Sequence, residues 1–254
     1  MSLVNKSALV TGAVGGIGSA ICVELLKNGI KYLSALDLSS EEPKIISEWR
    51  KKYPRVSIKY FKVDVTSKEE LEKCYSEFTS GIPNLDIVIN CAGIYNESIP
   101  KKVVEVNLLG VIQSTIIAIE YMRADKGKGK GGVILNIASI TGLNPFSISP
   151  TYSATKFGVI SYTRAVAYKR DHLGIKFLSL CPGVTDTELF HNCLNISFMS
   201  TKEREDNVKT KLEMQSSEDV GKAAVKYILT GQSGSVYIIE GGEFKEHPVN
   251  EMQI

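Results

Sequence analysis

The sequence predicts an α/β protein with one doubly wound, seven-stranded parallel sheet and helices on both faces. Two observations predict this class. Short, nearly continuous apolar runs alternate with segments of helical period along the chain, as in sheets whose strands are joined by crossover helices. A length of 254 residues also suits one large sheet better than two independent catalytic units, so we expect a single domain over residues 1–254.

The predicted elements alternate regularly. Apolar runs predict strands at Ser7–Val10, Tyr32–Leu36, Val56–Val63, Leu85–Asn90, Val133–Ala138, Lys176–Leu180 and Val236–Ile239. Helical periodicity predicts helices at about Ile17–Asn28, Glu42–Lys52, Lys68–Phe78, Lys102–Arg123, Tyr152–Asp171 and Glu218–Leu229. We expect Gly29 to end the first helix, Ser67 and Glu70 to form a capping box before the third, and Ser217 to cap the last.

Composition argues against several classes of protein. Thirty basic and twenty-eight acidic residues leave a net charge of +2, which gives no electrostatic basis for binding nucleic acid or a membrane surface. Polar residues interrupt the apolar stretch Val103–Met122, so no membrane span is expected. The five cysteines are scattered and form no CxxC pair, which predicts free thiols in a reducing compartment. We therefore expect a cytoplasmic protein.

A glycine-rich segment, TGAVGGIG at residues 11–18, joins the first predicted strand to the first helix. Glycines let the chain turn sharply and bring backbone amides against a pyrophosphate at the positive N-terminus of the helix. The segment predicts a Rossmann-type dinucleotide site, with Gly12, Gly16, Ile17 and Gly18 against the cofactor. Its spacing is GxxxGxG rather than GxGxxG, so the position between strand and helix carries the argument, and a plain turn is the alternative.

Asp37 ends the second predicted strand, nineteen residues after Gly18. A carboxylate there can accept hydrogen bonds from both ribose hydroxyls of NAD and would repel the 2′-phosphate of NADP. No Lys or Arg lies in residues 11–18 to neutralise that phosphate, so we expect NAD as the cofactor. The alternative is that Asp37 caps the following helix.

Polar and small residues end the next two strands. Asp64, beside Val65, could bind an adenine amino group, or it could be a turn residue. Ala92 and Gly93 would leave room for the adenosine ribose. Asn90 is a cofactor-site candidate, although a buried side-chain amide more readily ties neighbouring strands because it must find hydrogen-bond partners.

Tyr152 and Lys156 are the candidate catalytic pair. They are four residues apart on a predicted helix, which places them on one face. A phenol titrates near 10 in water, and a neighbouring ammonium favours the phenolate that can accept a proton at lower pH. Ser139 follows the fifth strand and could donate a hydrogen bond to a substrate oxygen. Asn107 is a poor helix former with no local reason to be mid-helix, and it could hold a water chain to Lys156.

Together these residues resemble the short-chain dehydrogenase/reductase family. The matching pieces follow the family's order over about residues 5–240: the glycine loop, Asp64, Asn90-x-Ala92-Gly93, Asn107, Ser139, Tyr152-xxx-Lys156 and Pro182-Gly183. Residues 139–156 are most similar to the NAD-linked branch of insect alcohol dehydrogenase and 15-hydroxyprostaglandin dehydrogenase. Cys91 is one departure, because many members carry a second Asn there.

The resemblance implies an NAD-dependent alcohol dehydrogenase with assigned site residues. Tyr152 would be the general acid/base, Lys156 would lower its pKa and hold the nicotinamide ribose, Ser139 would orient the substrate oxygen, and Asn107 would support a proton relay. After Pro182 and Gly183, the residues expected to contact the nicotinamide carboxamide are Val184, Thr185 and Thr187.

We expect the substrate to be a hydrophobic alcohol, secondary or allylic, such as a terpenoid, fatty or prostanoid one. Its contacts should come from Ile94–Ser98, Ile140–Pro150 and a lid at about residues 187–215, where an apolar half precedes a charged half. The alternative is that these apolar residues belong to the core. His191 and Cys193 lack further ligands nearby, so we expect no metal.

The helices at 102–123 and 152–171 are apolar on more than one face, which predicts a homodimer through a four-helix bundle, with a tetramer also open. Three rival functions remain: a carbonyl reductase working in the reverse direction, a non-catalytic NAD-binding member of the family, and a racemase or dehydratase on the same scaffold.

Overall fold

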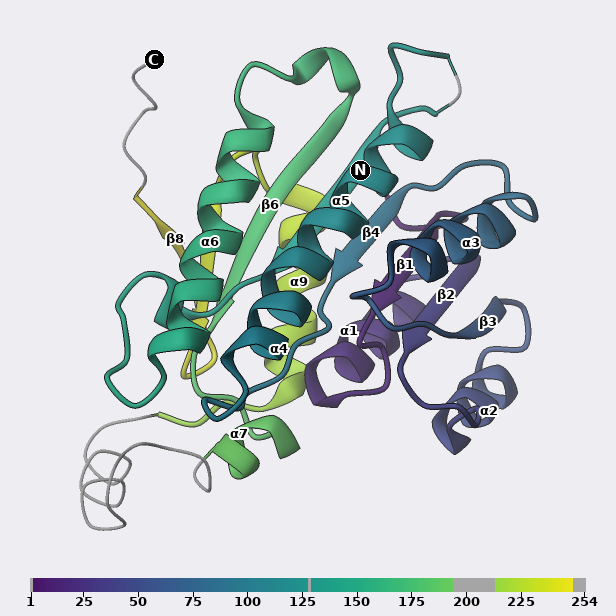
Figure 1. The fold of residues 1–254 in the computed structure, drawn as a ribbon. Coiled ribbons are helices and arrows are strands. Elements are labelled where there is room, and N and C mark those ends of the chain that lie inside the picture. The colour runs from purple at the N-terminus through teal and green to yellow at the C-terminus, as the bar shows by residue number, and fades with distance from the viewer. Residues whose placement is uncertain (1, 128, 194–212, 249–254) are drawn as a thin grey trace.

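The computed structural model describes residues 2–127, 129–193 and 213–248. Within them the strands form one sheet in the order β3-β2-β1-β4-β5-β6-β7-β8 (Figure 1). The strands are β1 (Ser7–Thr11), β2 (Tyr32–Asp37), β3 (Ser57–Lys62), β4 (Ile87–Asn90), β5 (Gly132–Ile137), β6 (Ile175–Pro182), β7 (Val236–Glu240) and β8 (Glu243–His247). The strand order reverses between β1 and β4, so the predicted doubly wound sheet is confirmed, and its ligand site is expected beyond the carboxyl ends of these strands.

The seven predicted parallel strands are all present, and an eighth strand that was not predicted, β8, extends the sheet. β8 pairs antiparallel with β7, whereas every other neighbouring pair is parallel. Gly241 and Gly242 connect the two strands, and both have positive φ angles, 56° and 79°, which suit a tight two-residue hairpin. The β8 sequence EFKEH has no apolar run, so a search for buried strands misses it.

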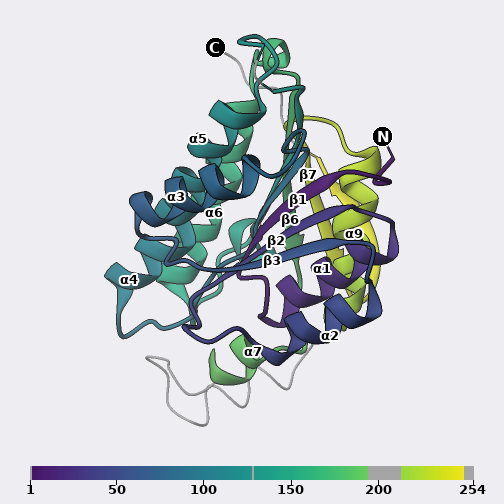
Figure 2. The ribbon, with the colours of Figure 1, turned by 90° about the vertical axis from the view of Figure 1, so that its right-hand side faces the viewer.

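Helices cover both faces of the sheet, as Figure 2 shows. Helices α1 (Gly16–Lys27), α2 (Lys44–Lys52) and α9 (Ser217–Thr230) lie on one face. Helices α3 (Lys68–Thr79), α4 (Pro100–Val104), α5 (Gly110–Met122) and α6 (Pro150–Ala167) lie on the other. The short helix α7 (Glu188–Cys193) follows the end of β6, below the sheet in Figure 1.

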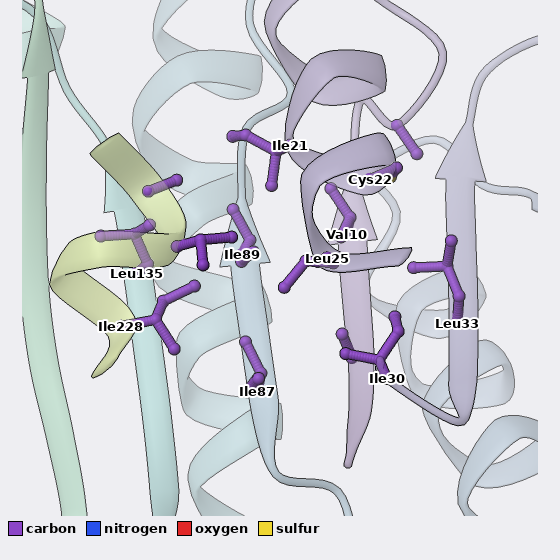
Figure 3. Packing of buried hydrophobic residues seen from close by; sticks show 14 of the residues in the cluster. Val10, Ile21, Cys22, Leu25, Ile30, Leu33, Ile87, Ile89, Leu135 and Ile228 are labelled. Atoms are coloured by element: carbon purple, nitrogen blue, oxygen red, sulfur yellow. The ribbon is translucent and has the colours of Figure 1, made fainter. Parts of the chain in front are cut away.

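Aliphatic side chains join the helices to the sheet. Ile21 and Leu25 of α1 lie against Val10 and Ile89 on the strands, and Ile228 of α9 lies beside Leu135 (Figure 3). All six side chains are fully buried. Burial of one such side chain is worth about 1.5–3 kcal/mol. This packing fixes the position of α1 over β1 and therefore the position of the glycine-rich turn between them.

The helix ends follow the sequence signals with one shift. Ser67 Oγ accepts a hydrogen bond from Glu70 N–H at 3.2 Å, as expected for a cap, but the Glu70 carboxylate binds the Asp64 amide instead of returning to Ser67. The cap of α9 is Ser216, whose Oγ accepts from Asp219 N–H at 3.1 Å, so the predicted cap at Ser217 is wrong by one residue.

The helix predicted at Lys102–Arg123 contains a change of winding. It begins at Pro100, continues through a π-helical turn at Glu105–Leu109 and ends at Met122. By length and apolar composition this stretch could cross a membrane, but half of its most apolar window is buried inside the protein. That burial is compatible with the core helix of a soluble protein.

Candidate active site

A cavity of about 970 Å³ opens at the carboxyl ends of the strands. Most of the residues that the sequence nominated line it: Gly12, Gly16, Ile17, Gly18, Asp37, Asp64, Val65, Ala92, Gly93, Ser139, Tyr152, Lys156, Pro182, Gly183, Val184, Thr185 and Thr187. Two nominated residues, Asn90 and Asn107, lie behind its wall. The structure thus brings the glycine loop and the Tyr-Lys pair to one cavity, although they are more than a hundred residues apart in the chain.

The glycine loop is held so closely that side chains are excluded. Gly12 has a φ of +65°, and a Cβ there would lie 2.7 Å from Ala92 Cα. A Cβ on Gly16 would lie 2.6 Å from Thr187 Cγ2, and one on Gly18 would collide with the Gly12 carbonyl oxygen. The loop therefore presents bare backbone at the start of α1, which fits a pyrophosphate.

Asp37 supports this loop from the end of β2. Its Oδ2 accepts from Val14 N–H at 3.1 Å, and its Oδ1 accepts from Leu38 N–H at 2.8 Å. The following helix begins at Lys44 with Pro43 in the cap position, so Asp37 does not cap it. The carboxylate lies in the cavity wall, where it fits the ribose next to the pyrophosphate.

The Asp64 carboxylate accepts hydrogen bonds within its own turn and pairs with Lys102, a residue that the sequence did not nominate. Its Oδ1 accepts from the Thr66 amide at 2.9 Å and from the Thr66 hydroxyl at 2.7 Å. Lys102 Nζ lies 3.4 Å from Asp64 Oδ2 and also lines the cavity. Partial burial raises the pKa of Asp64, but the Thr66 hydrogen bonds and Lys102 together outweigh it and lower that pKa.

Asn90 ties structural elements together instead of lining the cavity. Its Nδ2 donates to Asn136 Oδ1 on β5 at 2.8 Å and to Thr115 Oγ1 on α5 at 3.1 Å. Asn136 Nδ2 in turn donates to Thr163 Oγ1 on α6 at 2.8 Å. This buried chain links both central strands to the two helices that cover them, which is the structural role anticipated for an enclosed amide.

Tyr152 and Lys156 lie on one face of α6, toward the cavity. Lys156 Nζ is 5.4 Å from the centroid of the Tyr152 ring and donates to the Ile137 carbonyl at 2.9 Å. The lysine is 4% exposed, and this burial lowers its pKa to about 8. Because one of its three protons binds Ile137, two remain for other acceptors.

Ser139 is at the end of β5, in the same cavity wall. It is 8% exposed, and its Oγ accepts from Thr141 N–H at 3.1 Å. That bond uses a lone pair of the oxygen, so the hydroxyl proton is left to donate. Ser139 can therefore polarise a carbonyl or hydroxyl oxygen placed between it and Tyr152.

Asn107 lies in the π-helical turn and is completely buried. Its Oδ1 accepts from Ile94 N–H at 2.8 Å, and its Nδ2 donates to the Ile94 carbonyl at 2.9 Å. Gly93 separates it from Lys156, because a Cβ there would lie 3.5 Å from Asn107 Oδ1 and 3.8 Å from Lys156 Nζ. Asn107 thus fixes the cavity loop after β4 next to the lysine.

Two thiols lie next to the lysine. Burial is the main cause that raises the pKa of Cys91 to about 12 and that of Cys181 to about 12. Both thiols therefore stay protonated at neutral pH.

The substrate end of the cavity is mostly apolar. Ile94, Tyr95 and most residues from Ile140 to Ser149 line it, together with Leu189 and Phe190 of α7. The remaining residues of the expected contact segments, Asn96, Glu97, Ser98 and Pro150, do not. Glu240, the last residue of β7, and His247 of β8 also line the cavity and were missed: the predicted seventh strand stopped at Ile239, and β8 was not predicted.

Residues 194–212, the greater part of the expected lid, lie outside the described residues, as does the side chain of Cys193. His191 Nε2 is 2.8 Å from Asp186 Oδ1.

The geometry defines a Rossmann-type protein with a dinucleotide cavity and a tyrosine–lysine pair. The short chain dehydrogenase family model matches residues 6–195, and the chain belongs to this family. Among curated proteins it is 32% identical over 246 residues to alcohol dehydrogenase 1 of Ceratitis capitata and 31% identical over 245 residues to alcohol dehydrogenase 1 of Ceratitis cosyra. Each match covers 95% of this chain and 94% of the relative. Within the family the chain falls in the insect alcohol dehydrogenase-like branch.

Solved structures agree with this assignment. Levodione reductase superposes with a TM-score of 0.82 at 25% identity, over 94% of this chain and 98% of that one. ElxO with NADP bound superposes with a TM-score of 0.76 at 26% identity, with the same coverage. The protein is therefore an oxidoreductase that uses a nicotinamide cofactor.

Proposed function

We propose that the protein is an NAD-dependent alcohol dehydrogenase that oxidises hydrophobic alcohols, secondary or allylic, to the ketone or aldehyde. One observation carries the proposal: Ser139, Tyr152 and Lys156 line the same cavity as the glycine loop and Asp37. Terpenoid, fatty and prostanoid alcohols are the candidate substrates, since the substrate end of the cavity is mostly apolar. The related Ceratitis proteins, which carry the name alcohol dehydrogenase, support the same reaction class.

The proposed mechanism assigns each polar group one task. Bound NAD supplies the acceptor for the carbinol hydride. The Ser139 hydroxyl donates to the substrate oxygen, and the Tyr152 phenolate takes the hydroxyl proton. The Lys156 ammonium stabilises that phenolate and holds the nicotinamide ribose through the protons that Ile137 does not use. Asn107 holds the loop beside Lys156 for a proton relay.

The proposed hold on the cofactor is divided among several segments. Gly12, Gly16, Ile17 and Gly18 would receive the pyrophosphate, Asp64 and Val65 the adenine, and Ala92 and Gly93 the adenosine ribose. Val184, Thr185 and Thr187, after Pro182 and Gly183, would meet the carboxamide.

Asp37 is the reason for proposing NAD rather than NADP. Its carboxylate lines the cavity beside Leu38, so a 2′-phosphate bound there would meet a negative charge. Lys102, which also lines the cavity, is paired with Asp64 at 3.4 Å. Turnover with NAD should therefore exceed turnover with NADP under the same conditions.

The test is Tyr152→Phe in the intact protein, assayed by NADH absorbance at 340 nm with propan-2-ol, cyclohexanol, geraniol and a prostanoid alcohol. Loss of the phenol should reduce kcat by about 100- to 10,000-fold while NADH binding, followed by fluorescence, persists. Tyr162→Phe is the matched control, because Tyr162 lies on the same helix outside the cavity lining. Substantial residual turnover in Tyr152→Phe would overturn the proposal.

A carbonyl reductase working in the opposite direction is the second candidate, favoured by the likeness to levodione reductase. The same residues would act, with Tyr152 donating the proton. Rates with NADH and NADPH on ketones, compared with alcohol oxidation by NAD and NADP, separate the two. A wild-type protein that binds NADH but turns over nothing would favour a non-catalytic family member.

We also propose a cytoplasmic homodimer. Leu109, Ile116 and Phe157 are 45%, 51% and 40% exposed on the π-helical turn, α5 and α6. Large apolar side chains gathered on one helical layer favour a partner, and a second copy would form a four-helix bundle. Size-exclusion chromatography with light scattering distinguishes a monomer from a dimer or a tetramer.

A further inference from the structure

The buried carboxylate of Glu97 holds the first turn of the helix that carries Tyr152. Glu97 lies in the connection between β4 and α4 and is 3% exposed. Its Oε2 accepts from Thr151 N–H at 3.0 Å, and its Oε1 accepts from Tyr152 N–H at 2.9 Å. One side chain therefore binds two amides of α6 from more than fifty residues away in the chain.

These bonds complete the hydrogen bonding at the start of α6. Pro150 has no N–H, and Ser153 N–H donates to the Ser149 carbonyl at 2.8 Å. Ser149 occupies the cap position, but its side chain does not cap the helix, and its buried hydroxyl has no hydrogen-bond partner within the described part of the chain. Glu97 thus accepts hydrogen bonds from the first amides of α6, a capping role that in other helices belongs to a serine at the N-cap position.

The same connection also contacts the Tyr152 ring. The Tyr95 ring centroid lies 5.3 Å from that of Tyr152, and the Tyr95 hydroxyl donates to the Ile148 carbonyl at 3.0 Å. The segment Tyr95–Glu97 therefore holds Tyr152 twice, at its backbone and at its ring. Because Tyr95 also lines the substrate end of the cavity, this segment connects the substrate wall with the reacting phenol.

Three titratable side chains lie next to Tyr152. The Lys156 ammonium lies over its ring, the Tyr95 phenol beside the ring, and the Glu97 carboxylate at its own amide. Within the described residues no Lys, Arg or His forms an ion pair with Glu97. Its negative charge is met by the positive N-terminus of α6, which would otherwise favour the phenolate.

We propose that Glu97 is a positioning residue, which fixes the place of the Tyr152 phenol and balances the helix charge next to it. This inference rests on the proposed role of Tyr152 as the acid/base group. Nothing in the geometry requires Glu97 to touch substrate or cofactor, and it is absent from the cavity lining.

The test is Glu97→Gln in the full-length protein, assayed with NAD and the fastest alcohol of the panel above. The neutral amide keeps one acceptor but places an NH₂ group against an amide donor. We expect kcat/KM to fall about 10-fold, while the NADH dissociation constant stays within about twofold. The acid limb of the pH profile should move down by about 0.5 unit, because a negative charge near the phenolate is removed.

Two further variants separate position from charge and from general damage. Glu97→Asp keeps the charge on a shorter side chain, so kcat should fall while the acid limb stays at its wild-type pH. Glu72→Gln, the same substitution on the exposed face of α3, should behave as wild type. An unchanged pH profile in Glu97→Gln, or an activity loss matched by lost NADH binding, would overturn the inference. A wild-type rate in Tyr152→Phe would instead defeat the proposed function itself.

Discussion

The two ends of the cavity are shaped by different parts of the chain. At the cofactor end the walls are backbone: Gly12, Gly16 and Gly18 lie where a Cβ would strike a neighbouring atom. At the substrate end the walls are side chains, such as Leu143 and Phe146, carried by connections beyond the strand ends. Backbone walls admit few substitutions, whereas side-chain walls can be rebuilt residue by residue. A glycine-rich turn between strand and helix therefore indicates the cofactor class, whereas the side chains at the other end determine which alcohol fits.

The largest expected effect is at the backbone end. In Gly18→Ala the new Cβ would collide with the Gly12 carbonyl oxygen, and we expect a loss of about 3 kcal/mol or more in the free energy of unfolding. Gly15→Ala is the matched control, since a Cβ there lies 3.5 Å from the same oxygen, an ordinary contact, and should cost less than about 1 kcal/mol. Urea unfolding measures both, and equal losses would contradict the contrast.

Lys156 lies between the cofactor end and the substrate end of the cavity, and its replacement should have the next largest effect on stability. Burial lowers its pKa from 10.5 to about 8, so between these values the unfolded chain binds more protons and stability rises with pH. Lys156→Met removes this contribution. The unfolding free energy of wild type minus that of the variant should increase by about 2–3 kcal/mol from pH 7.5 to pH 10.5. A difference that stays flat in urea unfolding over this range would contradict the assignment.

Asp37 should set the cofactor preference at the backbone end. Asp37→Asn removes the negative charge that opposes a 2′-phosphate, so the ratio of kcat/KM for NAD to that for NADP should fall about 10- to 50-fold. Glu48→Gln, on the exposed face of α2 and outside the cavity lining, should leave this ratio unchanged. Steady-state kinetics with the two cofactors give the ratio, and an equal fall in both variants would argue against Asp37.

The smallest effect is expected at the side-chain end. Phe146→Ala removes an apolar ring from the cavity wall, and KM for a hydrophobic alcohol should rise about fivefold, or about 1 kcal/mol. NADH binding, measured by fluorescence titration, should be unchanged. A weaker NADH affinity would mean that the two ends are not independent.

Most of the fold could be predicted because apolar runs mark buried parallel strands. All seven of those strands lie close to where the runs predict them, within a few residues at each end. β8 could not be found this way, because four of its five residues are exposed and it is held only along one edge. The π-helical turn at Glu105–Leu109 was also missed, because apolar periodicity does not distinguish one turn of π winding from the α-helix around it.

The site residues also fall into two groups, those that a local sequence pattern predicts and those that it does not. Local spacing nominates Tyr152 with Lys156 and Gly12 with Gly18, because helical period and a strand–turn–helix order bring them together. Glu97 and Lys102 have no local pattern, because their partners lie 54 and 38 residues away in the chain. Glu97 precedes the start of α4, and nothing in the neighbouring sequence indicates that it caps α6 instead.

The β7–β8 hairpin has a consequence for how copies of this protein meet in solution. Without β8, the apolar strand β7 would offer a full row of unpaired amides and carbonyls to any extended segment that approached it. β8 occupies that row and replaces it with an outer strand of alternating charge, Glu243, Lys245 and Glu246, which disfavours strand-to-strand recruitment. This edge of the sheet is therefore a poor template for strand pairing between copies of the protein.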